Sequence, residues 1–206
     1  MTGGWSAVVV FKGRGASKSR LELADRAALA EAFLLDTLAA VAAARGVSSL
    51  LLVTSDVAAA SAATGEHPAL VVVPDPGTLD AAVSLGAARA LLERPEAPVV
   101  VLTGDLPALV AADLDRALSA VAGALPAVVP DREGSGTTAL LLSAGALIEP
   151  AFGPHSLERH RAAGCAVVPV PDTSTLRLDV DTVADLRDAE EVGVGPHTAL
   201  ALAAAA

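Results

Sequence analysis

Short apolar runs alternate along the chain with longer segments of helical composition. In the first half these runs cover residues 7–11, 50–54, 70–73 and 99–103, and none of them alternates polar with apolar positions. Strands buried on both faces have this character, as in parallel sheets flanked by helices. The repeated order of strand and helix predicts right-handed β-α-β units and an open, doubly wound α/β sheet.

The segments between these runs predict helices at residues 21–45, 56–64, 78–93 and 111–122. The first is followed by Gly46, a residue type that commonly terminates helices, and Thr78 has a side chain that can cap the third. In doubly wound sheets, ligands bind beyond the carboxyl ends of the strands. We therefore expect the loops after Phe11, Val73 and Thr103 to line one cleft.

The second half of the chain has a different pattern. The apolar runs at 127–129 and 138–142 are separated by a turn too short for a helix, which predicts an antiparallel pair within the mostly parallel sheet. We expect a helix at 156–163, a strand at 166–170, an extended piece at 176–180, a helix at 182–190 and a terminal helix at 198–206. No internal repeat or linker interrupts the sequence, so a single domain is expected.

The composition narrows the range of functions. Hydrophobic residues make up 53% of the 206 residues and aromatic residues only 2%, so Val, Leu and Ala must build the core. The few aromatic rings and the net charge of -10 argue against a nucleic-acid partner, because single strands stack on rings and acidic surfaces repel phosphate backbones. No apolar run approaches the ~18 residues of a membrane helix. Without a signal-peptide pattern, this favours a cytoplasmic protein with no membrane partner.

Positive charge is concentrated just after the first predicted strand. Lys12, Arg14, Lys18 and Arg20 lie within ten residues, and Lys12 and Lys18 are the only lysines of the chain. Such a loop can neutralise a triphosphate, although a solvated basic loop is the alternative. Its glycine spacing matches neither a Walker A loop nor a dinucleotide fingerprint.

Three aspartates are candidate metal ligands. Asp105 follows Gly104 at the end of the run 99–103, where a hard oxygen ligand can hold Mg²⁺ beside substrate phosphates; a turn or helix cap is the alternative. Asp179 and Asp181 flank Val180 ahead of a predicted helix. In an extended segment they would point to opposite faces, so that one faces a metal while the other caps the helix or braces the loop.

Two further segments are candidate anion sites. The turn at 134–138 combines glycines with hydroxyl side chains, and residues 152–156 place Ser156 at a helix start. A plain hairpin connection is the alternative for the turn. The four histidines and Cys165 show no metal-ligand spacing; His155 is expected at the surface and Cys165 as a small buried filler. Two anion sites beyond the basic loop suggest a second anionic substrate.

Taken together, these stretches resemble the phosphoenolpyruvate and 2-phospho-L-lactate guanylyltransferases of coenzyme F-420 biosynthesis, within the nucleotidyltransferase superfamily. The residues that carry the resemblance lie at 10–21, 104–109, 130–137, 152–161 and 179–182. The resemblance implies a GT-A-like nucleotidyltransferase domain over residues 1–206, with a nucleotide half at about 1–110 and an acceptor half at about 111–206. One departure is Asp80, where the family tends to carry Asn.

The resemblance also assigns roles to individual residues. It implies that Mg²⁺ is held by Asp105 and Asp179, with Asp181 as a close competitor for the second ligand position, and that Lys18 and Asp105 act in catalysis. It implies that the phosphorylated acid is held by Thr137, Gly153 and Ser156. The residues it places at the GTP are Lys12, Lys18, Arg20, Gly77 and Asp80.

The implied reaction joins two anions. A phosphate oxygen of the acceptor attacks the α-phosphorus of GTP, and pyrophosphate leaves. We favour phosphoenolpyruvate as the acceptor, then 2-phospho-L-lactate; molybdopterin or a sugar phosphate is the alternative. A nucleotide-binding module without catalysis and a receiver domain are further alternatives, the latter disfavoured because the first strand does not end in an acidic pair. The sequence leaves the oligomeric state and the strictness for guanine open.

Overall fold

The computed structural model describes residues 4–13, 26–121 and 123–205. Within these residues, seven strands form one sheet in the order β3-β2-β1-β4-β6-β5-β7. The strands are β1 (Trp5–Val10), β2 (Val47–Val53), β3 (Val71–Val73), β4 (Val99–Thr103), β5 (Ala127–Pro130), β6 (Thr137–Leu142) and β7 (Ala166–Val167).

The sheet is mostly parallel, as the apolar runs predict. Strands β3, β2, β1 and β4 run parallel to one another, whereas β6 is antiparallel to both β4 and β5. Strand β5 therefore points in the same direction as β4. As a result, β4 and β5 end at the edge of the sheet where β6 begins, and loops from both halves of the chain meet there.

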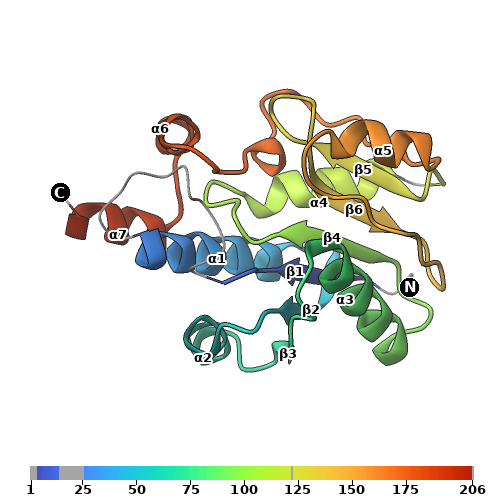
Figure 1. The fold of residues 1–206 in the computed structure, drawn as a ribbon, viewed down its shortest axis with the longest axis horizontal. Helices are drawn as coiled ribbons and strands as arrows, with labels where there is room; N and C mark the ends of the chain where they lie inside the picture. The colour runs from blue at the N-terminus through green and yellow to red at the C-terminus, as the bar shows by residue number, and fades with distance from the viewer. Residues whose placement is uncertain (1–3, 14–25, 122, 206) are drawn as a thin grey trace.

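Helices cover both faces of the sheet (Figure 1). They are α1 (Arg26–Ala43), α2 (Val57–Glu66), α3 (Leu79–Glu93), α4 (Ala111–Ala120), α5 (Ser156–Ala162), α6 (Val183–Val192) and α7 (Pro196–Ala205). Val9 of β1 packs with α1 and α4, whereas its neighbour Val8 packs with α3 on the opposite face. Because both faces are covered, successive positions of the central strands are equally apolar.

Two expectations for the second half are wrong in detail. The piece expected to be extended at 176–180 contains a 3-10 helix, η1 (Thr175–Arg177). It is held by side-chain bonds in place of a strand ladder: Thr138 donates to the carbonyl oxygen of Leu176, and the N–H of Thr175 donates to Asp113. The strand expected at 166–170 is reduced to β7, because the N–H of Val170, which would continue the pairing with β5, donates to the carbonyl oxygen of Val168 at 2.8 Å.

The C-terminal helix packs against α1 (Figure 1). Its first turn is capped from outside by Asp36 of α1, which is 4% exposed. The N–H groups of His197 and Thr198 donate to the two carboxylate oxygens of Asp36 at 3.0 and 2.8 Å. Phe33 of α1, with Leu186 of α6, belongs to a third apolar cluster on this side of the molecule. Within the described residues, no helix is both long and apolar enough to span a membrane.

Candidate active site

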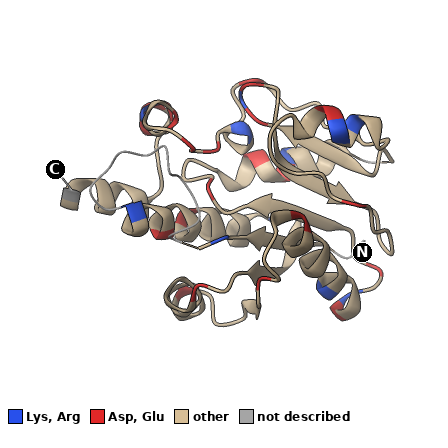
Figure 2. Cartoon of the chain, in the orientation of Figure 1, with Lys and Arg blue, Asp and Glu red and all other residues tan. Residues whose placement is uncertain are grey.

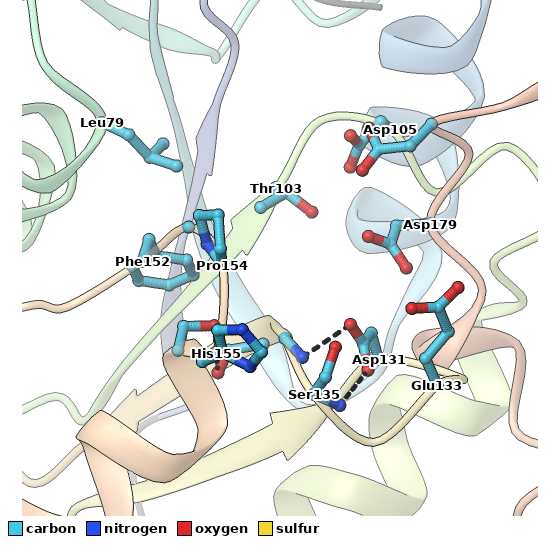
Figure 3. Close-up of a pocket in the computed structure, with 15 residues that line it drawn as sticks. Leu79, Thr103, Asp105, Asp131, Glu133, Ser135, Phe152, Pro154, His155 and Asp179 are labelled. Atoms are coloured by element: carbon cyan, nitrogen blue, oxygen red, sulfur yellow. Dashed lines mark hydrogen bonds between the residues drawn. The ribbon is translucent and has the colours of Figure 1, made fainter. Parts of the chain in front are cut away.

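A cavity of about 520 Å³ opens at the edge of the sheet where β4 and β5 end and β6 begins. Figure 3 shows Asp105 and Asp179 on one side of it, and Phe152, Pro154 and His155 on the other. The lining residues come from both halves of the sequence: Leu79, Thr103, Asp105, Asp131, Glu133, Ser135, Gly136, Thr137, Phe152, Gly153, Pro154, His155, Ser156, Asp179 and Asp181.

The first acidic wall is formed by the loop after β4. Gly104 packs so closely that a Cβ atom there would lie 3.1 Å from Leu34 Cδ1 and 3.2 Å from the carbonyl oxygen of Val10. The N–H of Gly104 donates to the same Val10 oxygen at 3.0 Å. This close contact with β1 fixes where the chain turns and directs the next residue, Asp105, to the cavity.

The second acidic wall is formed by the segment before α6. The N–H of Val180 donates to the carbonyl oxygen of Asp105 at 3.0 Å, which brings Asp179 to the same place. Figure 2 shows the acidic residues of both segments, the loop after β4 and the chain entering α6. The structure thus brings together carboxylates that lie far apart in the sequence.

Burial and the nearby negative charges change the titration of Asp179. Burial is the main cause that raises the pKa of Asp179 to about 8, and the charges of Asp105, Asp181 and Asp131 raise it further. A bound cation would relieve both effects. Among the described residues no group of three ligating side chains is preassembled for a metal ion. A carboxylate pair completed by substrate phosphates is, however, a common arrangement for Mg²⁺.

Asp181 does not cap the following helix. The N-cap is Thr182, whose hydroxyl accepts from the N–H of Asp185 at 3.2 Å, and Asp185 accepts in return from the N–H of Thr182 at 2.7 Å. The expected alternation of Asp179 and Asp181 is also wrong, because residues 178–181 are not in a strand and both side chains line the cavity.

The wall opposite the carboxylates contains the predicted acceptor residues. Thr137 begins β6, Gly153 lies in the preceding loop of α5 with a φ of 97°, and Ser156 begins α5. The Ser156 hydroxyl donates to Thr137 Oγ1 at 3.1 Å. Arg159 braces the loop by donating to the carbonyl oxygens of Ala151 and Phe152, each at 2.8 Å.

The predicted nucleotide residues are only partly described. Lys12 donates to the carboxylate of Asp75 and to the carbonyl oxygen of Gly77, each at 2.5 Å. Burial raises the pKa of Asp75, but the hydrogen bond from Lys12, the hydrogen bond from the N–H of Gly77 and the charge of Lys12 together outweigh it, so this pKa lies below its ordinary value. Lys12 therefore joins the end of β1 to the loop before α3. The predicted residues Lys18 and Arg20 lie outside the described residues.

Asp80 has a partner within the protein. Its carboxylate accepts a hydrogen bond of 2.8 Å from the N–H of Phe152. It thereby joins the first turn of α3 to the loop of the acceptor wall. Whether Asp80 also contacts a nucleotide stays a prediction.

Asp131 and His160 are absent from the sequence-based assignment. Asp131 lines the cavity and accepts from the N–H groups of Ser135 and Gly136 at 2.9 and 2.6 Å. The sequence does place the carboxylate of Asp131 directly after a buried strand, but this indicates a place in the site only when β5 is known to run in the same direction as β4. His160 lies behind Thr137 and is completely buried. The spacing of His160 from other residues in the sequence does not indicate a role in the site.

A family model described as guanylyl transferase CofC like matches residues 6–199. The chain belongs to this family. A CofC-like relative, the phosphoenolpyruvate guanylyltransferase of Streptomyces coelicolor, is 44% identical over 199 residues, which are 95% of this chain and 94% of that protein. Membership confirms the resemblance found in the sequence and the assignment as a nucleotidyltransferase, and it excludes a receiver domain.

Solved structures support the same fold for this CofC-like chain. A 4-diphosphocytidyl-2C-methyl-D-erythritol synthase superposes with a TM-score of 0.63 at 16% identity, covering 92% of this chain and 99% of that one. A Mycobacterium tuberculosis protein solved in complex with manganese gives a TM-score of 0.52 at 23% identity, covering 93% and 100%. At these identities the likeness concerns the fold alone, and the predicted nucleotidyltransferase fold is confirmed.

Proposed function

We propose that this chain transfers the GMP moiety of GTP to phosphoenolpyruvate and releases pyrophosphate, as a step in coenzyme F-420 biosynthesis. The observation that carries this is the cavity itself, which is lined by the acidic residues Asp105 and Asp179 and by the hydroxyl residues Thr137 and Ser156. An acidic wall suits a metal ion that binds phosphates, and a wall of hydroxyls suits a small anion. The name of the Streptomyces coelicolor relative agrees with this pair of substrates.

The metal is proposed to be Mg²⁺, held by Asp105 and Asp179 with Asp181 beside them. Burial raises the pKa of Asp179 to about 8, and the neighbouring carboxylates, whose charge a divalent cation would neutralise, raise it further. Oxygen ligands of this kind suit Mg²⁺, and the manganese complex of the Mycobacterium tuberculosis protein supports a divalent ion in this fold. When bound, the ion supplies electrostatic neutralisation of the phosphates.

The acceptor is proposed to bind against Thr137, Gly153 and Ser156. The two hydroxyls are 3.1 Å apart, a spacing that suits the oxygens of one carboxylate or phosphate. Pterins are bound by broad stacking surfaces, and in this cavity the rings are Phe152 and His155 on a single wall. Phosphoenolpyruvate is therefore favoured over molybdopterin, with 2-phospho-L-lactate as the next acceptor.

The reaction depends on the orientation of the acceptor and GTP more than on proton transfer. One phosphate oxygen of the acceptor forms a bond to the α-phosphorus of GTP, while the bond from that phosphorus to the bridging oxygen of pyrophosphate breaks. The attacking phosphate is already ionised near neutral pH, so no general base is required. The side chains on the hydroxyl wall hold the acceptor, and cations of the loop after β1, Lys18 and Arg20, are proposed to stabilise the triphosphate.

The test is a panel of acceptors and nucleotides. Pyrophosphate release is measured with GTP, ATP and CTP against phosphoenolpyruvate, 2-phospho-L-lactate and a sugar phosphate, with and without Mg²⁺. We expect release with GTP and phosphoenolpyruvate that stops when the metal is chelated. Turnover with the sugar phosphate alone would replace the proposed acceptor. GTP binding without release from any pair would favour a module without catalysis.

A further inference from the structure

His160 lies directly behind the proposed acceptor wall. It is on α5, it is 0% exposed, and its ring stands edge-on to Phe152 with centroids 5.2 Å apart. Both ring nitrogens have close polar neighbours: Nδ1 is 3.1 Å from Thr137 Oγ1, and Nε2 is 3.0 Å from the backbone nitrogen of Ala151. The ring does not itself line the cavity.

The neighbour at Nε2 decides which nitrogen carries the proton. A backbone N–H can only donate, so Nε2 must accept from Ala151 and cannot hold a proton. A neutral ring then carries its proton on Nδ1, where it donates to Thr137 Oγ1. Burial, the largest cause, lowers the pKa of His160 below its ordinary value, and the charge of Arg159 adds to this; the charge of Asp80 and a hydrogen bond with the backbone of Ser156 oppose it.

The proton on Nδ1 determines how the two hydroxyls of the wall are directed. Thr137 Oγ1 accepts from His160 and from the Ser156 hydroxyl, so its own proton is left to donate. If Thr137 instead donates to Ser156, the proton of Ser156 is left in the same way. In either arrangement, one of the two hydroxyl protons is left to donate to a group other than His160. Both hydroxyl residues line the cavity, so this donor is available to a ligand there.

We propose that His160 is a positioning residue that makes the Thr137–Ser156 hydroxyl pair a hydrogen-bond donor to an anionic oxygen of the phosphorylated acid. The inference rests on the proposed function for the place of the acceptor. It also adds a rule of selection: an oxygen that only accepts, as in a carboxylate or phosphate, matches this wall better than a neutral group that needs an acceptor.

Two variants separate the donor at Nδ1 from the acceptor at Nε2. In His160→Asn the amide nitrogen stands the same number of bonds from Cα as Nδ1, so the donor to Thr137 is kept and the contact to Ala151 is lost. In His160→Gln the amide group stands at the position of Nε2, so Ala151 keeps its acceptor and Thr137 loses its donor. Arg161→Ala, at an exposed position of the same helix, is the control.

The first measurement is steady-state kinetics with the acceptor varied at saturating GTP. We expect His160→Gln to raise KM for the acceptor roughly tenfold or more, on the scale of a lost hydrogen bond, with KM for GTP unchanged. His160→Asn should recover most of this loss, and Arg161→Ala should match the parent chain. If the KM for the acceptor in His160→Gln is equal to or lower than that in His160→Asn, the ring only holds Ala151 in place and the inference is overturned.

A second measurement does not depend on turnover. In the chain labelled with nitrogen-15 at histidine, the spectrum should show a neutral His160 ring protonated at Nδ1, identified by its loss in His160→Asn. A ring protonated at Nε2 would overturn the inference whatever the activity. Should phosphoenolpyruvate fail as acceptor while another phosphorylated acid reacts, the proposed function fails alone, and the kinetic series is run with the acid that reacts.

Discussion

The N–H of Val180 donates a hydrogen bond of 3.0 Å to the carbonyl oxygen of Asp105. This bond joins two loops through their backbones, so the positions of Asp105 and Asp179 are set by the fold and do not depend on a ligand between the carboxylates. Removing one charge should therefore affect the chemistry and leave the loops in place.

Replacing Asp105 tests this directly. We expect Asp105→Asn to lower turnover by at least ~100-fold, the scale for loss of a key electrostatic group, because the amide keeps the shape and removes the charge. Turnover and thermal melting should be measured together. Asp172→Asn, at a side chain that is 96% exposed, is the matched control and should keep full activity. Normal turnover in well-folded Asp105→Asn would remove Asp105 from the metal site.

The titration of Asp179 should make the metal-free protein less stable as pH rises. The folded pKa is about 8 against an ordinary value of 3.8, so between these values the folded state holds a proton that the unfolded state has released. The stabilisation that Asp179 contributes is thus fully present at pH values below 3.8 and is lost as the pH rises through about 8. Thermal melting in a chelator from pH 5 to 9 should show this decline, and Asp179→Asn should flatten it. An unchanged profile in the variant would show that another group is responsible.

The same proton should be released when a divalent ion binds. At pH 7 the carboxyl of Asp179 is mostly protonated, given its pKa of about 8, and a ligand must be ionised. Calorimetric titration with Mg²⁺ and GTP in buffers of different ionisation enthalpy should therefore show proton release at pH 7 that is smaller at pH 9. Equal values at both pH values would exclude Asp179 as the titrating ligand.

Lys12 is expected to serve the nucleotide side without contributing much to stability. Its ion pair with Asp75 is partly exposed, and pairs of this kind stabilise proteins by about 0–1 kcal/mol. We expect Lys12→Ala to raise KM for GTP and to move the unfolding free energy by less than about 1 kcal/mol. Arg89→Ala, which removes the exposed pair with Glu93 on α3, is the control. Wild-type kinetics for Lys12→Ala and for Lys18→Ala would remove both lysines from the nucleotide site.

The capping of α7 by Asp36 should matter for stability. Asp36→Ala leaves the N–H groups of His197 and Thr198 without their acceptors, and we expect a loss of about 1–3 kcal/mol in urea unfolding. Gly195→Ala should be similarly unfavourable, because a Cβ atom there would lie 2.3 Å from Asp36 Cγ. Leu200→Ala, at a side chain that is 72% exposed, is the control on the same helix. An intact unfolding free energy in Asp36→Ala would mean that α7 is held by other contacts.

The sheet was predictable because its pattern is local. Runs such as 99–103 are apolar at every position, and that alone indicates strands covered on both faces. The place of Asp105 followed from its position after such a run. The gap between 127–129 and 138–142 similarly fixed an antiparallel pair, since a helix does not fit there.

What could not be predicted depends on contacts between distant segments. His160 becomes part of the site only because α5 lies behind Thr137, which is 23 positions away. Asp80 meets Phe152 over 72 positions. At Asp181 the rule of alternation failed because the segment is bonded to Asp105 and is not in a strand. The spacing of these residues in the sequence does not indicate their contacts. The contacts follow from the strand order once that order is known.

The two outermost strands have a consequence for the behaviour of the protein in concentrated solution. More than half of the residues are hydrophobic, and a long, flat edge strand of such composition would allow neighbouring chains to add strands to the sheet. Here β3 has three residues and β7 has two, and prolines follow both, at Pro74 and at Pro169. Neither edge strand offers a length of unpaired backbone on which aggregation could be seeded.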